Sequence, residues 1–264
     1  MRVSLAVERR PPTGTSSGAV RLAMVHGFTQ NAACLRPLAN AVAEAVAEAG
    51  ASAVLSLVDA PGHGLSKHDD ADLVDAARLI VEVGGDGHYV GYSMGGRMLL
   101  HAALLFPDRF ASLTLIGATA GIESPADRAA RAEADEYLAQ QLETDGLEPF
   151  LDFWLGLPLF ASLSAEAACR GERMRNRVAG LAASLRLCGA GNQFPLWDLL
   201  DRIELPVQVI AGTEDTKFGE IGRLMVERMP CARFEPVAGG HAVHSEQPAA
   251  VARLISDFVL HVTP

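Results

Sequence analysis

Gly91-Tyr92-Ser93-Met94-Gly95-Gly96-Arg97 is the most informative segment of this chain of 264 residues. A short apolar run at 88–90 precedes it, and an apolar-periodic segment that reaches about Phe106 follows it. The pattern G-x-S-x-G between a strand and a helix is typical of a sharp turn that lifts a serine hydroxyl clear of the backbone. Glycine is needed at 91 and 95 because side chains there would collide across so tight a turn. We therefore predict that Ser93 is a catalytic serine.

Strand-like and helix-like segments alternate on both sides of this turn. Apolar runs typical of buried strands lie at 3–7, 20–25, 53–58 and 112–116, and helical periodicity lies at 34–49 and 73–83. Gly50 is placed to end the first of these helices. The Pro- and Gly-containing stretch 11–18 is interpreted as a hairpin or a flexible loop. The alternation predicts an α/β protein with a mostly parallel central sheet wound by helices.

The pattern changes between about 122 and 200, where only helical periodicity is present. Strand, helix, strand and helix patterns then return at 207–210, 221–228, 233–237 and 248–262. We predict a core of residues 1–120 and 201–264, with a helical lid at 121–200 inserted after the sixth strand. Catalytic residues of such sheets lie at the carboxyl ends of the strands, so the lid is expected to cover that edge. The alternative is an insertion that lies away from the site.

Composition limits the classes of function that fit the chain. The formal net charge is −10 without a block of like charges, which argues against nucleic acid and anionic membrane surfaces as partners. No segment reaches the roughly 18 consecutive apolar residues of a membrane span, and no secretory apolar region follows the first ten residues. The four cysteines have no metal-type spacing and are interpreted as buried thiols in a cytoplasmic protein: Cys34, Cys169, Cys188 and Cys231. We expect neither a metal nor a cofactor.

A serine hydroxyl becomes reactive when a histidine accepts its proton and a carboxylate orients that histidine. In sheets that carry this turn, the chain order is serine, acid, histidine. The strand at 207–210 leads into Glu214 and Asp215, and the strand at 233–237 leads into Gly239-Gly240-His241. We favour Asp215 over Glu214 because it lies further along the loop. We favour His241 over His244 because it directly follows the Gly-Gly turn.

Two backbone N–H groups are needed to stabilise an oxyanion in such a site. One is expected from Met94, the residue after the serine. The other is expected from the loop after the strand at 20–25, where the amide of Phe28 is the candidate. Gly27 before it lets the backbone approach closely.

Arg97 points to an acidic substrate. It lies four residues after Ser93, on the first turn of the following helix and beneath the predicted lid. A guanidinium there could bind a carboxylate bidentately, and the alternative is a salt bridge within the scaffold. The lid contributes six more arginines, most of which are expected to face solvent: Arg128, Arg131, Arg170, Arg173, Arg175 and Arg177.

With these residues in view, the chain resembles the α/β-hydrolase fold throughout. Within that fold it resembles the 2-succinyl-6-hydroxy-2,4-cyclohexadiene-1-carboxylate synthases of menaquinone biosynthesis. The segments shared with the whole fold are His26-Gly27-Phe28, Asp59-x-Pro61-Gly62-His63-Gly64-x-Ser66 and the serine turn. The segment Gly240-His241-x-x-His244-x-Glu246-x-Pro248 also matches. The segments more specific to the synthases are Arg97, Pro158-x-Phe160-Ala161-Ser162-Leu163 and Asp215-x-Lys217-Phe218.

The resemblance implies a lyase that removes pyruvate from a cyclohexene bearing succinyl, carboxylate and enolpyruvyl groups. It implies that the serine acts as a general base and forms no acyl-enzyme. Arg97, Arg131 and Arg175 would bind carboxylates. Tyr92, Trp154 and Lys217 would line the pocket. Two departures leave the substrate open: Leu155 stands where another aromatic is expected, and 171–191 lacks an Asn-Asn-Gly segment and keeps only Asn176.

Two other functions stay open. A serine hydrolase, that is an esterase, thioesterase or carbon–carbon-bond hydrolase, would use the same residues on an acidic substrate. A binding protein that kept the fold would have no need of an intact Ser, Asp and His set. We expect a small carboxylate-bearing molecule as the partner and a monomer or homodimer as the assembly.

Overall fold

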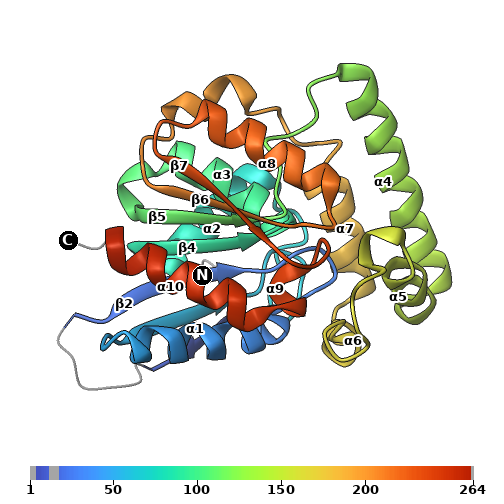
Figure 1. Ribbon diagram of the computed structural model, residues 1–264. Helices are drawn as coiled ribbons and strands as arrows, with labels where there is room; N and C mark the ends of the chain where they lie inside the picture. The colour runs from blue at the N-terminus through green and yellow to red at the C-terminus, as the bar shows by residue number, and fades with distance from the viewer. Residues whose placement is uncertain (1–3, 12–17, 263–264) are drawn as a thin grey trace.

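The computed structural model describes residues 4–11 and 18–262 (Figure 1). In these residues seven strands form one sheet in the order β1-β3-β2-β4-β5-β6-β7. The pairing of β1 with β3 is antiparallel, and the other pairings of described strands are parallel. The predicted α/β class with a mostly parallel sheet is therefore confirmed.

The strands are short and mostly buried. In chain order they are β1 (Val7–Arg10), β2 (Val20–Val25), β3 (Ala53–Val58), β4 (Gly87–Tyr92), β5 (Phe110–Ile116), β6 (Val207–Gly212) and β7 (Ala232–Val237). The α-helices between and after them are α1 (Arg36–Glu48), α2 (Leu73–Gly84), α3 (Met94–Leu105), α4 (Pro125–Asp145), α5 (Leu147–Leu155), α6 (Arg170–Arg173), α7 (Val178–Cys188), α8 (Thr216–Arg228), α9 (Val243–Glu246) and α10 (Pro248–Val262). Short 3₁₀ turns include η1 (Ala32–Leu35) and η3 (Pro158–Phe160).

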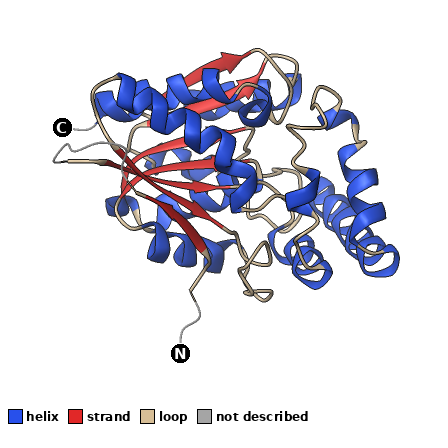
Figure 2. Cartoon of the chain, turned by 90° about the horizontal axis from the view of Figure 1, so that it is seen from below, coloured by secondary structure: helices blue, strands red, loops and turns tan. Residues whose placement is uncertain are grey.

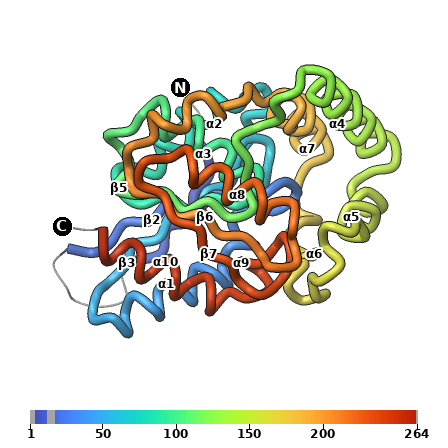
Figure 3. The backbone as a smooth tube through the Cα atoms, turned by 45° about the horizontal axis from the view of Figure 1, so that its top comes forward, coloured from blue at the N-terminus to red at the C-terminus, as the bar shows by residue number. Residues whose placement is uncertain are grey.

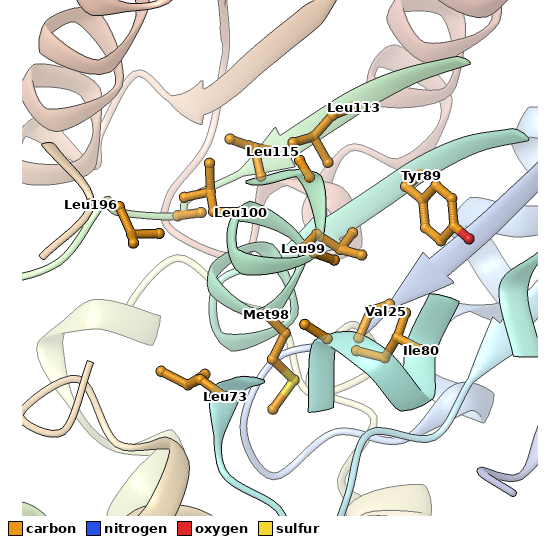
Figure 4. Close-up of a cluster of buried hydrophobic side chains, with 14 of the residues drawn as sticks. Val25, Leu73, Ile80, Tyr89, Met98, Leu99, Leu100, Leu113, Leu115 and Leu196 are labelled. Carbon is orange, nitrogen blue, oxygen red and sulfur yellow. The ribbon is translucent and has the colours of Figure 1, made fainter. Parts of the chain in front are cut away.

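Helices cover both faces of the sheet. α1 and α10 pack against each other and against one face, whereas α2, α3 and α8 cover the other. Figure 4 shows the second face, where Leu99 and Leu100 of α3 lie on the side of the strand residues Leu113 and Leu115, and Met98 points toward Leu73 and Ile80 of α2. Fully burying an aliphatic side chain of this size contributes about 1.5–3 kcal/mol to folding. This packing fixes α3, and with it the serine turn at its amino end.

The helices α4 to α7 stand together beyond one end of the sheet (Figures 2 and 3). They share a small apolar cluster that includes Leu142, Phe150 and Leu181. On the outside, the guanidinium of Arg186 on α7 pairs with Glu136 and Glu143 of α4. Between β5 and β6 the described chain contains helices, turns and loops but no strand. The division at 121–200 stays a prediction, although the helices it was based on do form.

The position of the insertion differs from the prediction. In the described residues it follows β5, the fifth strand, rather than a sixth. The expected first strand at 3–7 does not form as predicted: residues 4–6 are irregular, β1 begins at Val7, and residues 1–3 lie outside the described residues. β1 carries the charged sequence Val-Glu-Arg-Arg because it is an edge strand, where polar side chains can face solvent.

Three further boundaries differ. The strands flanking 11–18 do not pair with each other, because β1 and β2 both pair with β3, and residues 12–17 lie outside the described residues. The first helix starts as η1 and becomes α-helical only at Arg36. α8 begins at Thr216 rather than 221, because the Asp215 carboxylate accepts the N–H of Phe218 at 3.3 Å and starts the helix there.

Candidate active site

Ser93 occupies a strained turn between β4 and α3. Its backbone has φ +49° and ψ −109°, a region that residues with a side chain rarely adopt. The Ser93 N–H donates to the carbonyl of Ile116 at 2.8 Å, and the Gly95 N–H donates to the carbonyl of His26 at 3.1 Å. Hydrogen bonds to the ends of the neighbouring strands thus hold the strained serine in place, as is common where strain serves a function.

The glycines of this turn are required by space. A Cβ at position 91 would lie 2.7 Å from the Cα of Gly96, and one at position 95 would lie 2.5 Å from the carbonyl oxygen of Val25. Both contacts are with backbone, which cannot move aside. Side chains at positions 91 and 95 would therefore collide with the backbone, as the G-x-S-x-G pattern predicted.

The structure brings the three predicted side chains together from three loops. His241 Nδ1 lies 2.6 Å from Asp215 Oδ2, and His241 Nε2 lies 3.4 Å from Ser93 Oγ. Asp215 and His241 are buried, while Ser93 is partly open to the pocket. When the Nδ1–H group donates a hydrogen bond to the Asp215 carboxylate, Nε2 is left free to accept the serine proton. The separation of 3.4 Å is long for a hydrogen bond, which is common before substrate binds.

The two predicted oxyanion donors lie in the same pocket as Ser93. Phe28 and Met94 both contribute to its wall. In the described part of the chain neither backbone N–H has a hydrogen-bond acceptor. Free amides beside a partly open serine hydroxyl are what an oxyanion formed on a bound molecule would require.

A lid residue that the sequence reasoning did not select holds the loop that carries Phe28. Arg173 is 1% exposed, and its guanidinium donates to the carbonyl of Phe28 at 3.4 Å and to Thr29 Oγ1. Asn176 Nδ2 donates to the carbonyl of Thr29 at 2.6 Å. Thr29 has φ +66°, so these bonds stabilise a strained backbone. Arg173 and Asn176 thereby hold the conformation of the loop that carries Phe28.

The pocket above Ser93 has a volume of about 190 Å³ and lies between the carboxyl ends of the strands and the lid. Core residues from the ends of β4 and β5 and lid residues from α4, α5, α6 and α7 line it together. Residues of the insertion thus line the same pocket as Ser93, which favours an insertion at the site over one that lies away from it.

Positive charge gathers at this pocket. Arg97, Arg131 and Lys217, predicted to bind or line the pocket, do line it, and Arg173 joins them. Arg97 is 9% exposed, and the one hydrogen bond of its guanidinium within the described residues goes to Gln193 Oε1 at 3.5 Å. Arg97 therefore forms no salt bridge with the scaffold within the described residues. Burial lowers the pKa of Arg97 to about 10, so the side chain stays charged at neutral pH.

Arg131 differs from Arg97 because it has a carboxylate partner. Its Nε lies 2.8 Å from Asp135 Oδ1, one turn along α4, and Asp135 is itself buried in the pocket wall. The Asp135 Oδ2 oxygen accepts the N–H of Gly191 at 3.4 Å. Asp135 was not identified from the sequence, because an i,i+4 acid–base pair is usually a solvent-exposed feature of a helix.

Arg175 is not brought to this pocket. Its side chain is 64% exposed, pairs with Glu172 at 2.9 Å, and borders a separate cavity near Glu8 and Arg36. The predicted placement of Arg175 is wrong because α6 ends at Arg173, whose side chain is buried, and Arg175 follows the helix with its side chain in solvent. The helical period alone could not distinguish these two arginines.

Aromatic side chains form the apolar part of the wall. The Tyr92 ring lies 5.4 Å from the His241 ring and 4.0 Å from the His244 ring, measured between centroids. The Trp154 ring lies 5.1 Å from that of Phe28. In the described residues Trp154 Nε1 is buried without an acceptor, so it is a donor that a bound molecule could use.

Most other histidines are structural. Burial lowers the pKa of His26 to about 4 and the pKa of His63 and His244 to about 3, so these side chains are neutral near pH 7. His26 Nε2 accepts the N–H of Ala60 at 3.0 Å. His244 stands behind Tyr92 and does not line the pocket. The preference for His241 therefore agrees with the geometry.

The cysteines differ in burial. Cys34 and Cys188 are buried as expected, but Cys169 is partly exposed and Cys231 is exposed. The prediction of buried thiols is wrong for the latter two, because Cys169 lies on the lid surface before α6 and Cys231 lies in the turn between α8 and β7.

Within the described residues no group of three or more His, Cys, Asp or Glu is placed to hold a metal ion. None of the described helices is both long enough and apolar enough to cross a membrane.

Comparison with known proteins agrees with this geometry. The model of the "Alpha/beta hydrolase family" matches residues 22–254. The chain belongs to the alpha/beta hydrolase family. Among solved structures of this family, that of MenH from S. aureus superposes with a TM-score of 0.86 at 26% identity, covering 98% of this chain and 99% of that one. A thermophilic esterase from Thermogutta terrifontis, at 20% identity and a TM-score of 0.78, shares the fold.

Sequence relatives within the family carry the synthase name. A Bacillus subtilis protein, provisionally named a 2-succinyl-6-hydroxy-2,4-cyclohexadiene-1-carboxylate synthase, is 37% identical over 179 residues, and the match spans 66% of this chain but only 65% of that protein. The synthase of Enterobacter sp. (strain 638) is 30% identical over 210 residues, which cover 76% of this chain and 80% of the relative. The resemblance that the motifs indicated is confirmed.

Proposed function

We propose that this chain is a carbon–oxygen lyase that converts 2-succinyl-5-enolpyruvyl-6-hydroxy-3-cyclohexene-1-carboxylate to 2-succinyl-6-hydroxy-2,4-cyclohexadiene-1-carboxylate and pyruvate. The observation that carries the proposal is Arg97, a buried guanidinium without a carboxylate partner in the described residues, in the same pocket as Ser93. The names of the relatives support the same reaction.

The bonds that change follow from the chemical structures of the substrate and the diene product. Carbon 2 of the ring loses a proton, the double bond at carbons 3 and 4 becomes the 2,4-diene, and the bond from carbon 5 to the enolpyruvyl oxygen breaks. The electron pair leaves with that oxygen as the enolate of pyruvate, which takes up a proton on carbon. Carbon 2 bears the succinyl carbonyl, so negative charge develops on that carbonyl oxygen as the proton departs.

Ser93 and His241 would supply the base. As His241 Nε2 takes the hydroxyl proton, Ser93 Oγ takes the proton from ring carbon 2. Asp215 stabilises the imidazolium that forms, through its 2.6 Å contact with Nδ1. No bond between Ser93 and the substrate is needed.

The free N–H groups of Phe28 and Met94 would stabilise the charge on the succinyl oxygen. Arg173 keeps the Phe28 loop in the conformation that presents its amide. In this proposal Arg97, Arg131 and Lys217 bind the carboxylates of the substrate, with Arg173 as the fourth charge of the pocket and Arg175 taking no part. The cations attract an anion locally although the chain as a whole carries a formal charge of −10.

We also propose that residues 121–200 act as a lid over this site and that the chain works in the cytoplasm as a monomer or homodimer. The lid assignment is supported by the residues of α4 to α7 in the pocket wall. The location is supported by four free thiols, which a reducing compartment would preserve.

The test is to supply the enolpyruvyl cyclohexene and to follow pyruvate with a coupled dehydrogenase while recording the diene absorbance. We expect one pyruvate for each diene formed, and no product above background with Ser93→Ala. Arg170→Ala is the matched control, because Arg170 is a lid arginine whose ion pairs with Asp152 and Glu148 lie on the surface. Hydrolysis of acidic esters or thioesters without pyruvate release would instead make the chain a serine hydrolase.

A further inference from the structure

Two thiols meet where the lid contacts the core. Cys34 belongs to η1, in the core, and Cys169 immediately precedes α6, in the lid. The two thiols lie near enough to affect each other's ionisation, although 135 positions separate them in the chain. No disulfide joins them in the structure, where both are free.

The backbone around the pair is held by independent contacts. η1 and α6 pack directly against each other. Asn31 spans the junction, because its Oδ1 accepts from Cys34 Sγ at 3.8 Å and its Nδ2 donates to the carbonyl of Glu172 at 2.7 Å. Cys169 has φ +55°, a left-handed conformation that is unusual for a residue with a side chain. These contacts hold the two segments that carry Cys34 and Cys169 against each other.

The two thiols differ in a way that suits a reaction between them. Cys169 is partly exposed and reachable from solvent, whereas Cys34 is 4% exposed behind it. Interaction with the neighbouring Cys34 thiol lowers the pKa of Cys169, and the charge of Arg173 adds to this effect. The same interaction, together with burial, raises the pKa of Cys34. An accessible thiolate next to a second thiol is the arrangement of a redox-sensitive pair.

We propose that Cys34 and Cys169 are a dithiol that a peroxide oxidises to a disulfide, and that this bond fastens the lid to the core. The proposal is independent of the reaction assigned to Ser93, because it concerns a pair of side chains outside the pocket wall.

The chemistry balances with hydrogen peroxide as the oxidant. The Cys169 thiolate attacks one peroxide oxygen, the O–O bond breaks, and a sulfenic acid and hydroxide form. The hydroxide takes the proton of the Cys34 thiol to give water. The Cys34 sulfur then attacks the Cys169 sulfur and displaces its hydroxyl group, which leaves as a second water after protonation. Two thiols lose two electrons in total, and one peroxide becomes two waters.

The bond would act on the segment that supports the oxyanion loop. The N–H groups of Glu172 and Arg173 both donate to the carbonyl of Cys169, so the first turn of α6 moves with that cysteine. Arg173 in turn holds Phe28 and Thr29. A disulfide between Cys169 and η1 would therefore restrict opening of this part of the lid.

The test treats the purified full-length chain with a few equivalents of hydrogen peroxide and maps its disulfides by mass spectrometry without reduction. We expect a Cys34–Cys169 cross-linked peptide and loss of two of the four free thiols. Hydrogen exchange of the amides at 170–176 should become slower and recover after treatment with dithiothreitol. Cys231→Ser is the matched control and should keep the cross-link, because Cys231 is an exposed cysteine elsewhere.

Cys169→Ser should abolish the cross-link while leaving the chain folded, since this side chain is only partly buried. Cys34→Ser tests the other partner but removes a buried thiol, so its circular dichroism spectrum is measured alongside. Oxidation of Cys231 without a Cys34–Cys169 cross-link would overturn the proposal. A cross-link that leaves the exchange at 170–176 unchanged would overturn the claim that it fastens the lid.

Discussion

Replacing Arg97 with alanine tests the charge that defines the pocket. The guanidinium has one hydrogen bond in the described residues, a 3.5 Å contact with Gln193, so a substrate carboxylate would be its sole ionic partner. A hydrogen bond to a charged group contributes about 1.5–3 kcal/mol. At 1.4 kcal/mol for each factor of ten, Arg97→Ala should lower kcat/KM for pyruvate release by ~10- to 150-fold.

The assay is steady-state pyruvate release, with the free energy of unfolding measured in urea for each variant. Arg175→Ala is the matched control, because that arginine is 64% exposed and outside the pocket, where its pair with Glu172 contributes little. We expect a change of less than ~2-fold in kcat/KM for this control. Arg97→Ala with the same kcat/KM as the parent chain would refute the assignment, and so would an equal loss in Arg175→Ala.

Three further changes have defined outcomes. Asp215→Asn should leave the fold intact and lower kcat by about 10⁴-fold, because the amide favours the wrong tautomer of His241; a loss below tenfold in the coupled assay would contradict this. Arg173→Met should lower kcat more than it raises KM, because Thr29 and the oxyanion loop lose their buried donor, and a change confined to KM would speak against that role. Acid should destabilise the fold through five buried histidines: His26, His63, His88, His101 and His244. Burial holds their folded pKa values at about 3 to 4, below 6.5, so the unfolded chain binds more protons and stability falls as the pH drops from about 6.5 toward 4. Urea unfolding at pH 7 and pH 5 should show a loss of at most ~2 kcal/mol for each histidine, and equal stabilities would exclude the effect.

The core of the fold and the grouping of Ser93, Asp215 and His241 could be predicted from the sequence because local rules govern them. The turn at 91–97 needs glycines wherever it occurs, and buried parallel strands have continuous apolar runs. Each acid and histidine candidate follows one of these strands, so its place at the edge of the sheet follows from the strand. The edge strand could not be placed in this way, because the charged residues of β1 give no apolar pattern.

The lid side of the pocket depends on tertiary contacts that no local pattern records. Arg173 and Arg175 lie two positions apart in a short turn, and only the packing of α6 against η1 decides that Arg173 is buried. Asp135 likewise appears on α4 as one acid among several, and its burial depends on the turn at Gly189, where a Cβ would lie 2.4 Å from its Oδ2. Long-range contacts of this kind are visible only in the folded chain.

The most direct measurement uses substrate that carries deuterium at ring carbon 2, with pyruvate, the deuterium content of the diene and the intact mass of the chain recorded together. If Ser93 is the base of an elimination, each pyruvate released is matched by a diene that has lost its deuterium to solvent. The mass of the chain stays unchanged during turnover, and Ser93→Ala forms no product. A covalent adduct on Ser93 during turnover would contradict this mechanism. Release of pyruvate together with a ring product that retains the deuterium would also contradict it.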